Sequence, residues 1–369
     1  MAPRPVSPGS TDTAEVVTTT DVVIIGAGPA GLFAAFELGL LEINAHLVDA
    51  LPEPGGQCIE LYADKPIYDI PGIKVCSGRE LAQRLVEQLR PMNTPLHLGQ
   101  QVATLARRPD QRFDLSTTAG TRFNAGAVVI AAGAGAFVPR KPKLDRLARH
   151  EGRQVHYRLG NVADFVGCHV LVLGDDEIAI GAALCLADPA NAAPPARVTL
   201  LHRRDSFRAP PALLADLAAA RAAGRLHFVA GQPIDIAEAN GVLTGLSVVD
   251  ADGASHTLPA DAMLVLLGLS PKLGPVADWG LALEKRQLVV DAAQFQTSQP
   301  GVFAVGDVVT YPGKKKLILS GFHEATLAAF GVQALLRPGE CGPLQYTTTS
   351  PRLHRILGVA DQGAREDRG

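Results

Sequence analysis

The stretch DVVIIGAGPAGLFAAFELG, residues 21–39, decides the fold of this 369-residue chain. It begins with a β-branched apolar run, residues 22–25, which is typical of a buried strand. The run continues into Gly26-x-Gly28-x-x-Gly31, and apolar residues at helical spacing follow. In such a unit the first glycine permits a tight turn, the second leaves room for phosphate against the backbone, and the third lets helix and strand pack closely. The stretch therefore predicts a dinucleotide-binding unit.

A second strand and an acidic residue follow at the expected place. AHLVDA, residues 45–50, contains Asp49, which lies eighteen residues after Gly31. A carboxylate at the end of this strand can accept hydrogen bonds from ribose hydroxyls. The glycines alone could be a plain strand-to-helix turn, but the full order of strand, turn, helix, strand and acid favours a nucleotide site.

The remaining pieces of this unit lie far apart in the chain. Residues 127–131 form a further buried-strand pattern, and GVFAVGDVV (301–309) gives another strand followed by Gly306-Asp307; a helix pattern occupies residues 322–336. Such separation predicts a split domain. We expect an α/β fold of two Rossmann-like three-layer dinucleotide-binding domains, the second inserted in the first. The predicted boundaries are 1–20 for a disordered tail, 21–137 plus 297–369 for the first domain, and 138–296 for the second.

Composition excludes several other classes. The net charge of −3 argues against nucleic-acid binding, and no apolar run approaches the length of a membrane span. The five cysteines contain no CxxC or CxxxxC pair, so we expect reduced thiols rather than a disulfide framework or a zinc site. The first twenty residues lack the apolar centre of a signal peptide. A cytoplasmic protein without a bound metal is expected.

Four longer segments resemble a known family. They are GAGPAGLFAAFELGL (26–40), DALPEPGGQCIELYADKPIYDIPG (49–72), HRRDSFRA (202–209) and AVGDVVTYPGKKKLILSGF (304–322). These segments resemble the ferredoxin–NADP reductases of thioredoxin-reductase type, and the resemblance covers nearly the whole chain from Asp21. It implies FAD in the first domain, NADP in the inserted one, and a homodimer.

Carried over residue by residue, the resemblance implies one set of contacts for FAD. They are Gly26, Gly28, Ala30 and Gly31 at the pyrophosphate, Asp49 at the adenosine ribose, Gln57 and Tyr62 at the flavin, Val102 beside the adenine, Phe137 on the chain entering the inserted domain, Asp307 at the ribityl chain, and Thr348 near the isoalloxazine. Tyr346 is the candidate for the ring face opposite Tyr62, with half-buried packing as the alternative. The tail that carries Tyr346 could cover a partner subunit's flavin.

The sequence lacks the cysteine pairs that related enzymes use to accept electrons, and this bears on the electron acceptor. Thioredoxin reductases of this architecture carry a CxxC before the second nucleotide strand, and glutathione-reductase-like enzymes carry a CxxxxC near the flavin; this chain has neither. Electrons must therefore leave directly, which suits a one-electron carrier such as ferredoxin or flavodoxin. Docking an acidic carrier needs local positive charge. Lys314, Lys315 and Lys316 are candidates, and a solvated surface run is the alternative.

The second nucleotide turn, VLVLGDDEIAIGAA (170–183), departs from the family pattern. Asp176 stands where bare backbone should meet pyrophosphate, and its charge would oppose phosphate by about 4 kcal/mol at contact in an effective dielectric near 20. The strand after this turn ends in His202 and the arginines that the resemblance assigns to the 2′-phosphate of NADP: Arg203, Arg204 and Arg208. An empty, capped helix start is the plain structural alternative.

Three hypotheses remain from the sequence. The leading one is an FAD enzyme that transfers electrons between NADPH and ferredoxin or flavodoxin, as hydride to the flavin and then as single electrons to the carrier, with no obligatory acid–base side chain. The second is a flavoprotein with an altered donor or acceptor, such as NADH or a quinone. The third is a non-catalytic, flavin-bound redox sensor.

Overall fold

The computed structural model describes residues 16–339 and 345–359, and the chain divides into two compact units. The first combines Met1–Ala136 with Lys272–Gly369, and the second is Phe137–Pro271. Strands β9 (Ala136–Pro139) and β18 (Leu269–Lys272), where the chain passes between the units, pair with each other. The predicted fold class, α/β with the second dinucleotide-binding unit inserted in the first, is confirmed.

The return to the first unit comes at Lys272, earlier than the expected residue 297. The cause is apolar packing between these two positions. Val276, Leu281 and Leu288 are buried in the hydrophobic core of the first unit. Short strands in this segment, with little periodicity of their own, hide the boundary from the sequence.

The first unit is built on a seven-stranded sheet in the order β5-β2-β1-β8-β7-β6, with β21 paired to β8. Its strands are β1 (Val17–Ile25), β2 (Ala45–Val48), β5 (Leu96–His97), β6 (Val102–Arg107), β7 (Phe113–Thr117), β8 (Arg122–Ile130) and β21 (Val302–Ala304). Strands β5, β2, β1, β8 and β21 are parallel, whereas β6 and β7 form an antiparallel extension. Residues 22–25 at the centre are almost fully buried, as expected for a parallel strand covered on both faces.

Strand β1 begins earlier than predicted. Val17 pairs with Arg122 and Thr20 with Ala125, so residues 17–20 belong to the sheet. The expectation of a disordered tail is wrong for these residues, because the β-branched run Val-Thr-Thr-Thr extends the strand. Residues 1–15 of the predicted tail lie outside the described part of the chain.

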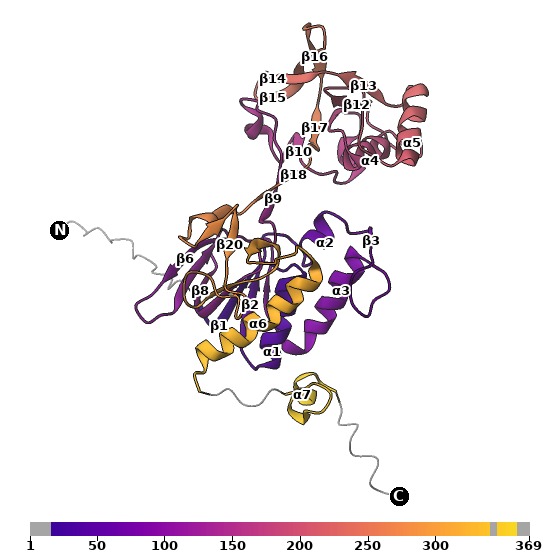
Figure 1. The fold of residues 1–369 in the computed structure, drawn as a ribbon. Helices are drawn as coiled ribbons and strands as arrows, with labels where there is room; N and C mark the ends of the chain where they lie inside the picture. The colour runs from indigo at the N-terminus through magenta and orange to yellow at the C-terminus, as the bar shows by residue number, and fades with distance from the viewer. Residues whose placement is uncertain (1–15, 340–344, 360–369) are drawn as a thin grey trace, which may run out of the picture. The chain divides into compact units, whose positions relative to one another are not determined.

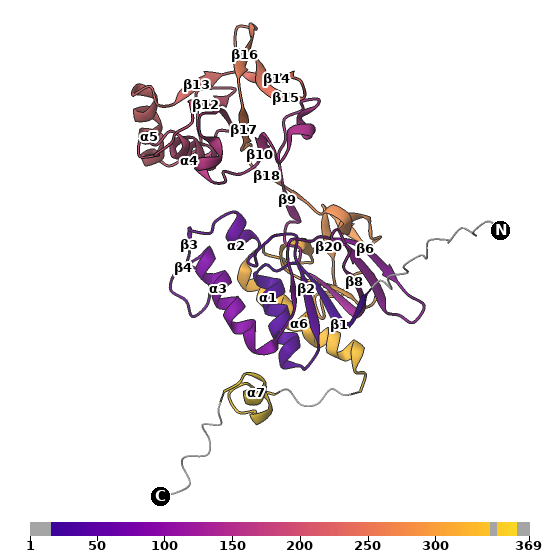
Figure 2. The same ribbon diagram turned by 180° about the vertical axis from the view of Figure 1, so that it is seen from behind.

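Three helices pack beside one another in this unit. They are α1 (Pro29–Leu40), α3 (Gly78–Leu89) and α6 (Ile318–Leu336), and α1 contacts both of the others (Figure 1, Figure 2). Helix α3 begins with a capping box, in which the Ser77 hydroxyl accepts from the Glu80 N–H and the Glu80 carboxylate accepts from the Ser77 N–H. The smaller elements are α2 (Gln57–Glu60), α7 (Pro351–Ile356), β3 (Pro66–Ile67), β4 (Cys76–Ser77), β19 (Leu283–Glu284), β20 (Gln287–Val289), β22 (Val309–Thr310), and the 3₁₀ turns η1 (Arg90–Met92), η4 (Gly274–Asp278) and η5 (Gly306–Val308).

The inserted unit has three layers around a five-stranded parallel sheet in the order β10-β17-β11-β12-β13. Alternate residues of β11 explain the layers: Val170 and Val172 join the core beneath the helices, whereas Leu171 and Leu173 join the core beneath an antiparallel meander. The elements are β10 (Val155–His156), β11 (His169–Leu173), β12 (Arg197–His202), β13 (His227–Ala230), β17 (Ala262–Val265), helices α4 (Glu177–Leu186) and α5 (Pro211–Ala222), the meander β14 (Gln232–Ala239), β15 (Val242–Val249) and β16 (Ser255–Pro259), and the turns η2 (Leu147–His150) and η3 (Val162–Phe165).

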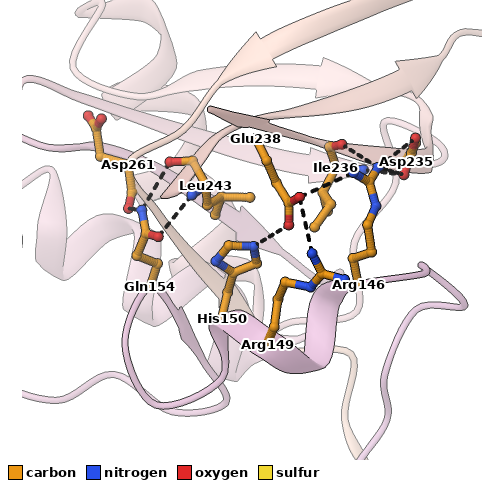
Figure 3. A network of polar contacts seen from close by, with 9 residues as sticks. All are labelled: Arg146, Arg149, His150, Gln154, Asp235, Ile236, Glu238, Leu243 and Asp261. Atoms are coloured by element: carbon orange, nitrogen blue, oxygen red, sulfur yellow. Dashed lines mark hydrogen bonds and ion pairs between the residues drawn. The ribbon is translucent and has the colours of Figure 1, made fainter. Parts of the chain in front are cut away.

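A polar network fastens the segment after the crossover onto the meander (Figure 3). The side chain of His150 is only 2% exposed, and its Nε2 lies 2.7 Å from Oε1 of Glu238. Arg146 and Arg149 form ion pairs with the same carboxylate, at 3.2 and 3.6 Å. Gln154 bridges β15 and the start of β17 by donating to the carbonyl oxygens of Leu243 and Asp261, both at 3.0 Å. This unit therefore has its own well-satisfied interior.

The structure adds one observation on membranes. None of the helices in the described part of the chain combines the length and the apolar character that crossing a membrane requires.

Candidate functional site

The glycine turn of the first unit leaves space in front of α1. A Cβ on Gly26 would lie 2.4 Å from the Ala131 carbonyl oxygen, and one on Gly31 would lie 1.8 Å from the Gly26 carbonyl oxygen, so the protein itself requires both glycines. A Cβ on Gly28 would meet nothing closer than the Gly56 Cα, at 3.9 Å. Within the described residues, no side chain caps α1, so its first N–H groups face this space. The turn can therefore receive an anion.

Asp49 lies at the end of β2, beside this turn. Its Oδ2 accepts a hydrogen bond from the Ala27 N–H, and its Oδ1 accepts one from the Leu51 N–H at 2.7 Å. Burial raises the pKa of the Asp49 carboxyl, and the two backbone donors partly offset that effect. The carboxylate is thus fixed at the carboxyl end of two adjacent parallel strands, where nucleotides bind in this class of fold.

Two predicted flavin contacts meet although 250 residues separate them. Nε2 of Gln57 donates to Oδ2 of Asp307 at 3.2 Å. A Cβ on Gly133 would lie 3.0 Å from the same Gln57 nitrogen, so the turn after β8 also converges here. Ala30, at the start of α1, faces Gly306, because a Cβ on that glycine would lie 3.3 Å from the Ala30 Cβ. The residues at the first turn, α2 and the Gly306-Asp307 turn therefore surround one space.

A buried ionic network beneath this space was missed from the sequence. Glu324 is fully buried, and its Oε2 accepts a hydrogen bond from the Gly306 N–H at 2.7 Å. Its Oε1 accepts from the Tyr311 hydroxyl at 2.9 Å and forms an ion pair with Lys314. Burial, helped by this hydrogen bond, raises the pKa of Tyr311 to about 12, so the phenol keeps its proton. A single carboxylate directly before the small and apolar segment ATLAAFG (325–331) was the available signal.

This network corrects one expectation about docking. The side chain of Lys314 is only 6% exposed and is paired with Glu324, so it is unavailable to an acidic carrier. Lys315 and Lys316 are exposed. A buried lysine in a KKK run arises because the preceding turn points it into the core, which residue type alone does not reveal.

An open pocket of about 420 Å³ lies beside Tyr62. Burial and the neighbouring Cys58 thiol raise the pKa of Tyr62 well above its ordinary value, so the ring is neutral. Tyr68, also in the pocket lining, is 71% exposed. The full lining is Tyr62, Pro66, Ile67, Tyr68, Asp69, Lys316, Leu317 and Ile318. This pocket presents aromatic and cationic groups at the edge of the predicted flavin site.

The other predicted contacts are placed differently. Val102 is 2% exposed at the start of β6, close in the chain to Gln100, whose N–H donates to the Asp49 carbonyl oxygen at 3.0 Å. The backbone of Phe137 lies in β9, and its side chain is outside the described part of the structure. Tyr346 and Thr348 are exposed.

The tail that carries these last two residues docks at the far end of α1. Arg352 of α7 forms an ion pair with Glu42, which follows the C-terminus of α1. The structure therefore does not bring Tyr346 and Thr348 to the glycine turn of the same chain, since that turn precedes the first residue of α1.

The second nucleotide turn is filled by side chains of the protein. Asp176 is the N-cap of α4, and its Oδ1 accepts from the N–H groups of Ile178 and Ala179, both at 3.1 Å. Gly174 retains its structural task, because a Cβ there would lie 2.4 Å from the Leu266 carbonyl oxygen. The turn keeps its backbone course and has lost its open amides.

The three predicted phosphate-binding arginines lie in the loop after β12. Arg203 and Arg204 are exposed. Arg208 donates two hydrogen bonds to the carboxylate of Asp175, from Nε at 3.0 Å and Nη2 at 2.8 Å. The Arg208 guanidinium holds the pKa of Asp175 below its usual range. One of the three arginines is thus engaged within the protein.

Comparison with known proteins identifies the family. Residues 20–329 match the pyridine nucleotide-disulphide oxidoreductase family. The chain belongs to this family. A protein of Verminephrobacter eiseniae named ferredoxin–NADP reductase is 54% identical over 346 residues, covering 92% of this chain and 97% of its own. One of the same name from Albidiferax ferrireducens is 52% identical over 341 residues, covering 92% and 96%.

Two solved structures share the fold of this chain. A thioredoxin reductase of Lactococcus lactis matches with a TM-score of 0.59 at 25% identity, covering 86% of this chain and 99% of that one. A bacillithiol disulfide reductase of Staphylococcus aureus matches with a TM-score of 0.61 at 17% identity and the same coverage. Unlike the thioredoxin reductase pattern, this chain contains no CxxC.

The first unit fits the FAD that the family implies. The space at Gly28 takes a group that a side chain would displace, and the uncapped start of α1 suits a pyrophosphate. Asp49 lies where a ribose would bind, and Gln57 and Asp307 present an amide and a carboxylate across the same space. The donor and acceptor set therefore agrees with a dinucleotide.

Proposed function

We propose that this protein is an FAD-dependent ferredoxin–NADP(+) reductase, which transfers electrons between NADPH and ferredoxin or flavodoxin. The observation that carries the proposal is the match, over 92% of the chain, to relatives named for this activity at 52–54% identity. The convergence of Gly28, Gln57 and Asp307 at one space supports the cofactor site.

The residues of the first unit bind and orient the flavin nucleotide. Gly28 and the start of α1 hold the pyrophosphate, Asp49 the adenosine ribose, and Gln57 with Asp307 the flavin end. Glu324 fixes the Gly306-Asp307 turn through its hydrogen bond to the Gly306 N–H. Bound FAD supplies hydride acceptance and single-electron release. Catalysis then consists mainly of positioning, and no side chain needs to act as acid or base.

The residues of the inserted unit bind NADP(H). Arg203 and Arg204 are exposed and suit the 2′-phosphate, since guanidinium groups form charge-assisted hydrogen bonds with phosphate. The absence of a CxxC from the sequence removes the dithiol through which a thioredoxin reductase would pass electrons. Lys315 and Lys316 are exposed, Lys316 lines the same pocket as Tyr62, and both supply positive charge for docking an acidic carrier.

We further place the protein in the cytoplasm as a homodimer in which Tyr346 and Thr348 approach the partner subunit's flavin. The position of α7 at the far end of α1 supports this assignment, because the tail then lies away from its own flavin site. Light scattering coupled to gel filtration measures the oligomeric state. Removal of residues 345–369 should change flavin solvent exposure in the dimer but leave FAD bound; unchanged exposure would contradict the role of the tail.

The experiment that tests the function is an anaerobic titration of the purified, FAD-loaded protein. We expect low NADPH to bleach the flavin absorbance rapidly and NADH to do so poorly, and the reduced protein to pass electrons to added ferredoxin. If dithionite bleaches the flavin but NADPH does not, the assignment of NADPH as donor fails.

The cap on α4 favours two alternatives: an enzyme with an altered donor or acceptor, such as NADH or a quinone, and a flavin-bound redox sensor. Rapid bleaching by NADH, or turnover with a quinone but not with ferredoxin or flavodoxin, would select the altered enzyme. Bound FAD without turnover with either nicotinamide would select the sensor.

A further inference from the structure

Both groups that should meet phosphate in the inserted unit already bind carboxylates of the protein. The first N–H groups of α4 donate to Asp176, as described above. Arg208 is held more extensively, because its backbone N–H also donates to the carbonyl oxygen of Asp175, at 2.7 Å. The His202 ring also lies beside this carboxylate, with Nε2 3.8 Å from the Asp175 Oδ2. The turn therefore carries its own anions at the phosphate positions.

Two other arginines of the loop after β12, Arg203 and Arg204, differ from Arg208. Within the described residues, neither Arg203 nor Arg204 forms an ion pair, although Arg203 lies near enough to Asp175 to stabilise its charge. Between these arginines and Arg208, Asp205 forms a two-pronged ion pair with Arg221 of α5, with both bonds at 2.8 Å. Two ion pairs therefore hold the loop in place, and only the pair between Asp175 and Arg208 involves a predicted phosphate ligand.

We propose that Asp175 is a specificity-determining residue of the nucleotide site: it holds Arg208 away from the 2′-phosphate, which must displace the carboxylate to gain the third arginine. This inference rests on the proposed use of NADPH. The phosphate competes well because it carries more charge than a carboxylate and offers three acceptor oxygens. The Arg208 side chain is 74% exposed, so the pair it leaves is weak. NADP(H) binding is therefore an exchange of anions on Arg208.

The exchange makes a sharp prediction for affinity. Asp175→Asn removes the competing charge with little change of shape and frees Arg208. We expect NADP⁺ and 2′,5′-ADP to bind about five- to tenfold more tightly, a factor typical of a weak surface ion pair plus its residual repulsion. NAD⁺, which lacks the 2′-phosphate, should change less than twofold. The preference for NADP⁺ over NAD⁺ should rise by the same factor.

The FAD-loaded protein is titrated with each of these three ligands by calorimetry. The matched control is Asp205→Asn, which removes the same charge from the loop that carries Arg208 and breaks an equally short pair that involves no predicted phosphate ligand. Arg208→Ala is made in the wild type and in Asp175→Asn. In the wild type we expect Arg208→Ala to weaken NADP⁺ binding less than twofold. In Asp175→Asn we expect it to abolish the whole gain in NADP⁺ affinity. Melting temperatures establish that each variant is folded.

The outcomes separate this inference from the proposed function. If NADPH bleaches the wild-type flavin but Asp175→Asn tightens NADP⁺ no more than Asp205→Asn does, the inference is overturned and the function stands. The inference is also overturned if Arg208→Ala weakens NADP⁺ binding by the same factor in the wild type and in Asp175→Asn. If NADP⁺ binds no variant and NADPH does not bleach the flavin, the proposed function fails, and the inference with it.

Discussion

Substituting Glu324 by Gln should destabilise the first unit and loosen its hold on FAD. The change removes one charge at a fully buried site and leaves the Lys314 ammonium, 6% exposed, without its partner. Removing one member of a buried ion pair typically costs about 3–5 kcal/mol. Because one kcal/mol shifts the melting temperature of a 150–250-residue domain by about 2–4 °C, we expect a fall of about 6–20 °C.

The loss should come mainly from the stranded charge. Gln can still accept the Gly306 N–H through its amide oxygen, and a single neutral hydrogen bond is worth only about 1 kcal/mol. Replacing Lys314 by Met in the same protein removes that charge, and apolar replacement of buried pairs is often neutral. Lys314→Met/Glu324→Gln should therefore be more stable than Glu324→Gln alone by about 2 kcal/mol or more.

The chain contains one tryptophan, Trp279, which packs against the core of the first unit. Its fluorescence therefore reports the unfolding of that unit separately from the inserted one. A melting temperature for Glu324→Gln within about 2 °C of wild type would show that the pair contributes little. A double variant as unstable as the single one would show that the stranded Lys314 charge is not the cause.

Three further predictions test the two units separately. Gly28→Ala should fold with an unchanged apoprotein melting temperature, because the nearest atom to its Cβ is the Gly56 Cα at 3.9 Å, yet it should retain little FAD after gel filtration; normal FAD content would refute the pyrophosphate assignment. Gln57→Glu places a second carboxylate against Asp307, so FAD should dissociate faster at pH 8 than at pH 5, measured by the recovery of flavin fluorescence; equal rates would contradict the contact. The hydrogen bond from His150 lowers the pKa of Glu238, so the stability it contributes is present above the unfolded-state pKa of about 4.3 and is lost as the pH falls through the lower folded-state value. Calorimetric melting of Glu238→Gln should therefore vary less with pH below 4.5 than that of wild type, and parallel curves would exclude this linkage.

Much of the fold could be predicted because its signals are local. Residues 22–25 are continuously apolar since a central parallel strand is buried on both faces, and Gly31 is required by the carbonyl oxygen of Gly26 in the same turn. The sequence places the segment 272–296 in the other unit because its short strands show no regular spacing of apolar residues. Its place is decided by Val276 and Leu288 packing into a distant core, which is a property of the folded chain.

The residues of the candidate site also divide into those with a local signal in the sequence and those without one. The glycines and Asp49 could be predicted from spacing, whereas Gln57 and Asp307 came only through resemblance, because nothing local joins residues 250 apart. Neither residue spacing nor the family resemblance points to Glu324. Its role depends on α6 crossing beside α1, which brings a carboxylate from the middle of a helix under the Gly306 N–H.

The first N–H groups of α1 and of α4 stand at equivalent places in the two nucleotide turns, but the two units should differ in how much stability they gain from a bound anion. At α1 the first N–H groups lack a side-chain cap within the described residues, so the first unit gains stability whenever an anion binds there. At α4 the same groups are satisfied by Asp176, and such a cap is worth about 1 kcal/mol. The inserted unit is therefore complete without nucleotide, and a ligand must offer more than the cap already provides. From this difference we expect FAD to be retained tightly and NADP(H) to bind and exchange transiently, which suits an enzyme that keeps one nucleotide and releases the other at every turnover.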